Sequence, residues 1–227
     1  MHNEFEILMF RAIDHPQLSE QYVHGHRDVL LTFGIKSVAS SNPSWTTNPG
    51  SHCLVAIQDG IIYGGIRIDI LSQEYPLPLQ DGVGHLDPNI NIELQKRMKE
   101  GIGEQCGLWN SHKIKGFGIS WILVNTSIAV LPTLGVAHLY GLASDYSMFL
   151  FRPAGFRIQT RFGSNGDFVY PTNDYIARVV TIEDVEQLSD TAENERSFIK
   201  TLRTNLNQMM ELKVTNVQLS LNFNLKI

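Results

Sequence analysis

A pair of glycines in the middle of the chain lies where an anion can bind. Gly116 and Gly118 belong to the segment Lys113-Ile-Lys-Gly-Phe-Gly118 and come directly before an apolar run of helical length. Glycines there let unpaired backbone N–H groups of residues 114–119 point outward at the positive end of the helix dipole. The segment therefore favours a phosphate or pyrophosphate as ligand, with Lys113 and Lys115 beside it. The simpler alternative is a tight turn flanked by solvated lysines.

A carboxylate precedes this loop on a strand-like segment. Glu104 is the only acidic residue between Glu100 and Asp145. On a half-buried strand the pKa of Glu104 should rise toward the range of a general base at neutral pH. The alternative is a solvated glutamate at the edge of a sheet.

The glycine loop does not match the common nucleotide-binding patterns. Trp121 stands where the fingerprint Gly-x-Gly-x-x-Gly has its third glycine, and no Gly-Lys-Ser/Thr P-loop occurs. The loop resembles instead the acyl-CoA loop of the GNAT superfamily of N-acyltransferases, Gln/Arg-x-x-Gly-x-Gly/Ala, with Lys113 in the Gln/Arg position. Leu134-Gly-Val136 before a strand and Gly155-Phe156 after a short helix extend the resemblance over about residues 52–162.

This resemblance implies an α/β fold with a GNAT-like central sheet that is mixed, mostly antiparallel and flanked by helices. One domain would span residues 1–227, with a core over about 5–180 and a C-terminal helical segment and closing strand over 181–227. Acyl-CoA or coenzyme A would be the co-substrate. The residues expected to bind it are Leu108, Trp109, Asn110, Lys113, Ile114, Lys115, Gly116, Phe117, Gly118, Ile119 and Ser144.

The resemblance also implies a mechanism. In the superfamily the strand before the loop is bulged and diverges from the next strand, so that the pantetheine arm lies between them; Gly107 is where a bulge would be least strained. A strand N–H near Leu108 or Trp109 would polarise the thioester carbonyl, and Glu104 would be the catalytic base. Many members protonate the leaving thiolate with a tyrosine, whose position here is Phe151. Phe151 favours the alternative function, an acyl-CoA-binding or sensing protein without turnover.

A second resemblance concerns the substrate. The order of His26-Arg27-Asp28-Val29, a tryptophan-bearing loop and Gly65-Ile-Arg67-Ile is similar to that of acyl-homoserine-lactone synthases and N-acyl amino acid synthases. It implies that an amino acid or other small amine is the acceptor and that Arg27, Trp45 and Arg67 contact it. Tyr146, one helical turn from Phe151, is a further expected substrate contact. Trp45 could equally fill the protein interior, and Arg67 could lie on a solvated strand face. The pattern departs at Gly107, where those synthases have arginine, and the acids of their tryptophan loop have no counterpart here.

Composition limits the other partners. A formal net charge of -5 without a run of Lys or Arg argues against nucleic acid and against an anionic membrane. Cys53 and Cys106 lie in apolar runs, which is typical of buried thiols in a reducing cytosol, and the N-terminus lacks a leader pattern, so we expect a cytoplasmic protein. His24, His26 and His52 lack metal-ligand spacing, so we expect no metal. The sequence leaves the possibility of a homodimer open.

The remaining elements are read from periodicity and turn signals. Strands are expected over 5–10, 53–58 and 61–70, the last two joined by an Asp59-Gly60 turn, and a helix over 17–33. Loops are expected over 36–51 and 71–92, and a short polar helix over 92–100. Strands are expected over 104–110 and 137–143, diverging near Gly107. Thr181 and Asp184 predict the start of helical structure that runs toward Leu212, and the alternation from Val217 to Ile227 predicts a closing strand.

Overall fold

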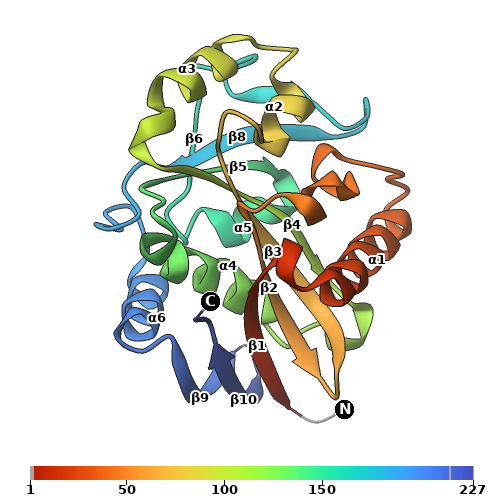
Figure 1. Ribbon diagram of the computed structural model, residues 1–227, viewed down its shortest axis with the longest axis vertical. Helices are drawn as coiled ribbons and strands as arrows, with labels where there is room; N and C mark the ends of the chain where they lie inside the picture. Colours follow the sequence, from red (N-terminus) through yellow and green to blue (C-terminus); the bar gives the residue numbers. More distant parts are fainter. Residues whose placement is uncertain (1–2, 215, 227) are drawn as a thin grey trace.

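The computed structural model describes residues 3–214 and 216–226 and shows one large sheet with helices on both faces (Figure 1). The strands are β1 (Glu4–Arg11), β2 (Ser51–Gln58), β3 (Ile61–Ile70), β4 (Ile102–Asn110), β5 (His138–Ser144), β6 (Arg157–Ile158), β7 (Asp167–Val169), β8 (Ile176–Ile182), β9 (Asn207–Val214) and β10 (Val217–Asn224). The helices are α1 (Pro16–Thr32), α2 (Pro78–Val83), α3 (Asn89–Arg97), α4 (Ile119–Val130), α5 (Asp145–Phe151) and α6 (Glu193–Thr204).

The strand order across the sheet is β6-β8-β5-β4-β3-β2-β1-β10-β9, with β7 paired to β8. Among the described strands, β4 with β5 and β1 with β10 are parallel, and the other pairs are antiparallel. The prediction of a mixed, mostly antiparallel sheet flanked by helices is therefore confirmed.

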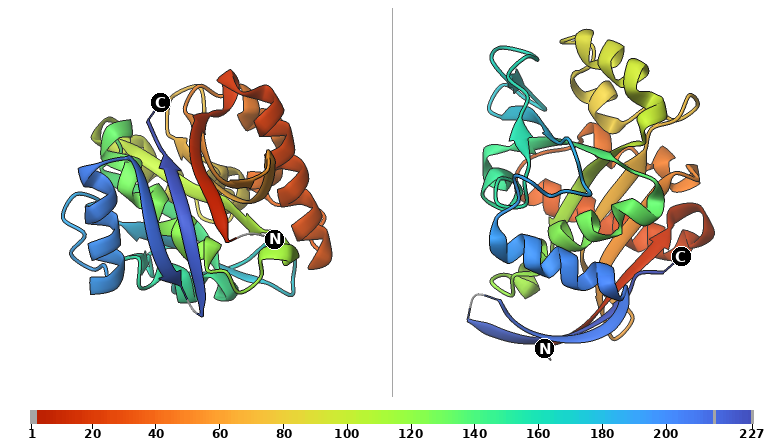
Figure 2. Two further views of the ribbon diagram at one scale, coloured as in Figure 1. Left: turned by 90° about the horizontal axis from the view of Figure 1, so that it is seen from below. Right: turned by 90° about the vertical axis from the view of Figure 1, so that its left-hand side faces the viewer.

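The helices form a layer on each side of the sheet (Figure 2). Helices α4 and α6 pack together on one face, and α1 lies on the other against β3 and β4. The largest apolar cluster lies under α4, where ten of the twelve helix residues are buried. A second cluster around Tyr22 and Trp45 lies under α1. Among the described residues, no helix is both long and apolar enough to cross a lipid bilayer.

Local sequence signals explain several element boundaries. Asp59 and Gly60 both adopt positive φ, at 52° and 75°, as the predicted two-residue hairpin turn between β2 and β3 requires. Helix α1 begins at Pro16, whose fixed φ suits the first helical position. Leu219, Leu221 and Phe223 bury one face of β10, which confirms the predicted closing strand over the described residues; Ile227 lies outside them.

Two predictions of secondary structure were wrong. The segment 71–92 is not a continuous loop, because it contains α2 and the start of α3. The helical structure expected from Thr181 to Leu212 is confined to α6, since β8 continues to Ile182 and β9 occupies Asn207–Val214. Asp184 does accept hydrogen bonds from the N–H groups of Glu186 and Gln187, but it caps a turn instead of a helix.

Candidate active site

Strands β4 and β5 separate in the middle of the sheet. They pair in parallel from Ile102 with His138 to Gln105 with Gly141, and the ladder ends there. The predicted divergence near Gly107 is therefore confirmed. Because β8 pairs with β5 as far as Ser144, the second half of β4 and the end of β5 form the two sides of an open wedge.

A β-bulge lies on β4 at the point of separation. Its register against β3 shifts between Gly65 and Arg67, and Gly107 adopts φ +61°. The Tyr22 hydroxyl, from α1, donates a 2.5 Å hydrogen bond to the Gly107 carbonyl oxygen. A Cβ atom at position 107 would lie 2.7 Å from the Tyr22 oxygen, so both the backbone angle and the space require glycine. The bulge is thus held from the α1 side of the sheet.

A cavity of about 440 Å³ occupies the wedge. It is lined by β4 from Glu104 to Asn110, by the ends of α1 and β5, by α5, and by the segments 35–40 and 170–175. Most of the lining is apolar or aromatic. Three large side chains of this lining are mostly exposed, namely Phe33, Tyr146 and Phe149, so the cavity opens to solvent between α1 and α5.

Glu104 is the acidic side chain of the cavity wall. It is 2% exposed, on a central strand, so the alternative of a solvated glutamate at a sheet edge is excluded. Its Oε2 atom accepts a 2.8 Å hydrogen bond from the Leu79 N–H, at the start of α2. Burial raises the pKa of Glu104 to about 8, although this hydrogen bond favours the carboxylate. The carboxyl group is therefore poised to exchange a proton near neutral pH.

A buried ion pair lies directly beside Glu104 on the same face of the sheet. Asp69 is the cross-strand neighbour of Glu104 on β3. It accepts hydrogen bonds from Arg67 Nε at 2.9 Å and from Arg67 Nη2 at 2.7 Å. Ser51 Oγ and Cys106 Sγ complete its surroundings, at 2.5 Å and 3.4 Å. The sequence reasoning missed Asp69, and the signal available was its place two residues after Arg67 on one strand.

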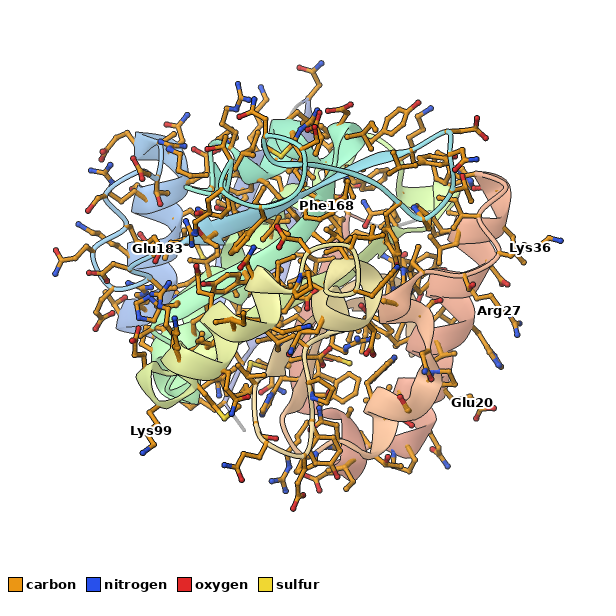
Figure 3. All side chains as sticks on the ribbon, turned by 90° about the horizontal axis from the view of Figure 1, so that it is seen from above. Glu20, Arg27, Lys36, Lys99, Phe168 and Glu183 are labelled. Atoms are coloured by element: carbon orange, nitrogen blue, oxygen red, sulfur yellow. The ribbon has the colours of Figure 1, made fainter. Side chains whose placement is uncertain are left out.

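The structure does not bring three of the four predicted acceptor-binding residues into the cavity. Arg67 is 1% exposed, so it is not on a solvated strand face. Its guanidinium lies 4.3 Å from the centroid of the Trp45 ring, and Trp45 is itself buried beneath α1 and does not line the cavity. Arg27 points outward from α1, beside Asp28 (Figure 3). Tyr146 does line the cavity.

The loop before α4 has the positive-φ glycines that the sequence indicated, but not all of the unpaired N–H groups. Those of Ile114, Lys115 and Phe117 donate hydrogen bonds to carbonyl oxygens within residues 111–114, so the expectation of free donors was wrong for these three. Gly116 and Gly118 both adopt positive φ, at 85° and 76°, and Gly118 is the N-cap of α4. Lys113 and Lys115 are exposed on either side of Ile114. Because the first N–H groups of α4 have no intrahelical partner, this end of the helix can receive an anion.

The other residues predicted to bind the co-substrate divide into two groups. Leu108, Trp109, Asn110 and Ser144 line the cavity. Ile114, Phe117 and Ile119 instead pack their side chains on the core, so only their backbone atoms could contact the co-substrate. The Asn110 side chain donates a 2.7 Å hydrogen bond to Ser120 Oγ and so ties the end of β4 to the first turn of α4.

Phe151 occupies the cavity wall where the family pattern has a tyrosine. Its ring stacks on Phe156 at 4.8 Å between centroids, and it is buried. The prediction that both cysteines are buried holds for Cys53; Cys106 is partly exposed and lines the cavity. The Cys106 sulfur nevertheless points to the buried Asp69 carboxylate, and desolvation of the thiol together with the charges of Asp69 and Glu104 raises its pKa, which makes it a poor nucleophile.

Several cavity residues could not be found from sequence. His26 lines the cavity, and burial, followed by the charge of Arg67, lowers its pKa to about 4. Tyr170 comes from the segment after β7 and accepts a 2.5 Å hydrogen bond from the Ala39 N–H. Within residues 3–214 and 216–226, no group of His, Cys, Asp or Glu side chains is arranged to hold a metal ion.

Comparison with known proteins supports this architecture. No protein-family model matches the chain, and a search of curated protein sequences finds no match. Solved structures do match. FeeM, an N-acyl amino acid synthase from uncultured soil microbes, is 12% identical with a TM-score of 0.63, over 84% of this chain and 96% of FeeM.

Two further structures match with lower scores. BjaI, a CoA-dependent acyl-homoserine lactone synthase solved with SAM and isopentyl-CoA, is 13% identical with a TM-score of 0.59, over 86% of this chain and 90% of BjaI. An acetyltransferase of the GNAT family from Staphylococcus aureus Mu50 is 14% identical with a TM-score of 0.50, over 77% of this chain and 97% of that protein. The sheet order, the diverging strands β4 and β5 and these structural neighbours together show that the chain has the GNAT-like acyl-CoA N-acyltransferase fold.

Proposed function

We propose that this protein is an acyl-CoA-dependent N-acyltransferase that moves an acyl group from a thioester to the amine of a small molecule. The observation that carries this proposal is the position of Glu104, a buried carboxyl group with a pKa of about 8 in the wall of the cavity between β4 and β5. The acyl-CoA co-substrate is supported by the BjaI structure, which contains isopentyl-CoA, and by the glycine loop before α4.

The reaction needs three contributions from the chain. The loop at 113–119 would hold the pyrophosphate of coenzyme A at the start of α4, and the pantetheine arm would lie in the wedge beside Asn110. A backbone N–H of β4 near Leu108 or Trp109 would donate a hydrogen bond to the thioester oxygen. The amine nitrogen would attack the thioester carbon, Glu104 would accept a proton from that nitrogen, and the C–S bond would break to release the coenzyme A thiolate.

A second candidate is an acyl-CoA-binding protein without turnover. Phe151 favours it, because a stacked, buried aromatic ring without a hydroxyl cannot protonate a thiolate. A coenzyme A thiolate leaves tolerably without a proton, since ordinary thiols have a pKa near about 8.5. Loss of this acid is therefore compatible with turnover, and the two candidates must be separated by measurement.

The separating experiment measures release of free thiol from several acyl-CoAs in the presence of a pool of amines, for wild type and Glu104→Gln. The variant keeps the size and the acceptor oxygen but removes the basicity, so turnover at neutral pH should fall about 100- to 10,000-fold with little change in coenzyme A binding. Glu74→Gln, at an exposed glutamate away from the cavity, is the matched control. Equal rates for wild type and Glu104→Gln would remove Glu104 from the mechanism, and no release in any form would favour the binding protein.

A further inference from the structure

The charge in the cavity beside Glu104 restricts which amine can bind. The charge-bearing side chains near Glu104 are Asp69, Arg67 and Asp81, and Arg67 and Asp69 neutralise each other. Among the described residues, those that line the cavity include neither lysine nor arginine. His26, the basic side chain of the lining, is neutral above about pH 4. The cavity therefore offers an acceptor for an ammonium group but no partner for a carboxylate.

Arg67 is not available to a substrate carboxylate. Its Nε and Nη2 atoms are bound to Asp69, its Nη1 atom donates a 3.0 Å hydrogen bond to the Ser40 carbonyl oxygen, and one face of the guanidinium is covered by Trp45. A substrate carboxylate could reach Arg67 only by displacing Asp69. That exchange would leave the Asp69 carboxylate buried without its cation, which is strongly unfavourable.

The part of the cavity between Glu104 and the opening, where the amine would bind, is otherwise lined by apolar and aromatic side chains. Tyr170 and Pro78 line it near Glu104, and Phe33 and Tyr175 line it toward the opening. Burial and the nearby Glu104 both raise the pKa of Tyr170, so its hydroxyl remains neutral. Aromatic faces of this kind bind apolar groups and attract ammonium groups. A buried carboxylate in the same place would lose its hydration without gaining a charged partner.

We propose that the acceptor is a primary amine with an uncharged, apolar or aromatic body, and that amino acids with a free carboxylate are excluded. This inference rests on the proposed N-acyltransferase function and makes it narrower. It also separates this chain from FeeM, which is an N-acyl amino acid synthase. The excluded group is the α-carboxylate, and the feature that excludes it is the closed Arg67–Asp69 pair beside Glu104.

The test compares three acceptors that share one aromatic body: 2-phenylethylamine, phenylalanine and phenylalanine amide. Release of coenzyme A thiol is measured with the acyl-CoA that gives the fastest rate, and kcat/KM is corrected for the fraction of free amine. Phenylalanine amide controls for the size of the carboxylate without its charge. We expect 2-phenylethylamine and the amide to exceed phenylalanine by at least about tenfold, because only phenylalanine buries an unpaired anion.

The Asp69→Asn variant provides a second measurement. It removes the partner of Arg67, so a substrate carboxylate can bind the released guanidinium, and the ratio of kcat/KM for phenylalanine to that for 2-phenylethylamine should increase. The ratio is insensitive to changes at Glu104 that affect both acceptors equally. If this variant does not fold, the comparison of the three acceptors with wild type still decides the proposal.

The outcomes are distinguishable. A kcat/KM for phenylalanine that equals or exceeds the values for the other two acceptors would overturn the exclusion of carboxylates and leave the N-acyltransferase function intact. An unchanged ratio in a folded Asp69→Asn variant would overturn the role of the Arg67–Asp69 pair. Thiol release that none of the amines accelerates above the rate of hydrolysis, in which water takes the acyl group, would overturn the N-acyltransferase function and this inference with it.

Discussion

At the scale of single residues, Glu104 should make stability depend on pH in an unusual direction. An unfolded glutamate has a pKa of about 4.3, whereas burial raises the pKa of Glu104 in the folded protein to about 8. Between these values the folded protein holds a proton that the unfolded chain has lost, so stability falls as the pH rises and the full penalty is present above pH 8. The penalty is on the order of 4–5 kcal/mol, from about 1.36 kcal/mol per pKa unit.

At pH 9 the Glu104→Gln variant should therefore have a larger free energy of unfolding than wild type. At pH 5 it should have no such advantage. Urea denaturation at both pH values measures the difference. The same difference in unfolding free energy at both pH values would mean that Glu104 ionises in the folded protein as it does in water.

His26 should act in the opposite pH range. Burial lowers its pKa from 6.5 to about 4, so protonation favours the unfolded chain, and stability falls as the pH drops through the interval between these values. The His26→Gln variant should lack this loss of stability in acid, so its free energy of unfolding should change less than that of wild type between pH 6.5 and 4. His24→Gln, on the exposed side of the same helix, is the control and should keep the wild-type profile. Parallel profiles for wild type and His26→Gln would contradict the burial of a neutral histidine.

A site residue could be predicted from sequence when its neighbours along the chain mark it, and not when its role depends on contacts between distant segments. Glu104 could be singled out because it is the only acid between Glu100 and Asp145, whereas its full burial was not predicted, since a solvated position at a sheet edge was left open. Asp69 could not, because its proximity to Glu104 depends on the register between β3 and β4. Neither alternative for Arg67, contact with the acceptor or a solvated strand face, included its burial. Strand alternation puts Arg67 and Asp69 on one face of the sheet but does not say whether α1 covers that face.

At the scale of elements, the glycine loop before α4 is the part to test for co-substrate binding. A Cβ atom at Gly118 would lie 2.2 Å from Val214 Cγ1, so a substitution there would disturb packing as well as binding. A Cβ atom added at Gly116 would have no neighbouring atom within 4 Å, and only the positive φ is strained. Gly116→Val should therefore reduce the rise in melting temperature that coenzyme A produces.

Gly135 provides the matched control at the other end of the same helical segment. It also has a positive φ, and an added Cβ atom would also meet nothing within 4 Å. Gly135→Val should carry a similar strain yet keep the full coenzyme A shift. Equal shifts in Gly116→Val and Gly135→Val would place the anion away from the loop.

The elements themselves were predictable where one signal dominated. The Asp-Gly turn, the apolar run of α4 and the alternation of β10 are each unambiguous in the sequence. β9 was missed although Gln208, Met210, Leu212 and Val214 alternate with exposed residues. The helix prediction from the pair Thr181 and Asp184 was extended over this segment despite its period of two, and pairing with β10 decides the conformation.

At the scale of the whole molecule, the C-terminal hairpin is continuous with the sheet that carries the site. β10 pairs in parallel with β1, and β1 pairs with β2, so β9 and β10 extend the sheet at the edge opposite β6 and β8 (Figure 2). The side chain of Phe223 on β10 is buried in the same apolar cluster as α4 and packs edge-on against Phe198 of α6, at 6.1 Å between ring centroids. This shared core predicts that residues 1–227 unfold as one cooperative unit.

Phe223→Ala tests that prediction because it lies far along the sheet from the cavity. Removing a buried aromatic ring should cost about 3–5 kcal/mol, and the loss should appear equally in every probe if the chain is one unit. All the proteins compared carry Trp121→Phe, because Trp121 of α4 packs on Phe198 and would report on the hairpin side of the core. Tryptophan fluorescence then reports on Trp45 and Trp109 under α1, and far-ultraviolet circular dichroism reports on the whole backbone. The two transitions should coincide in wild type and shift together in the variant, whereas Met209→Ala, at an exposed side chain of β9, should shift neither. Tryptophan fluorescence that stays at its wild-type midpoint while the circular dichroism transition moves would show that the hairpin and α4 belong to a unit that unfolds separately from the site.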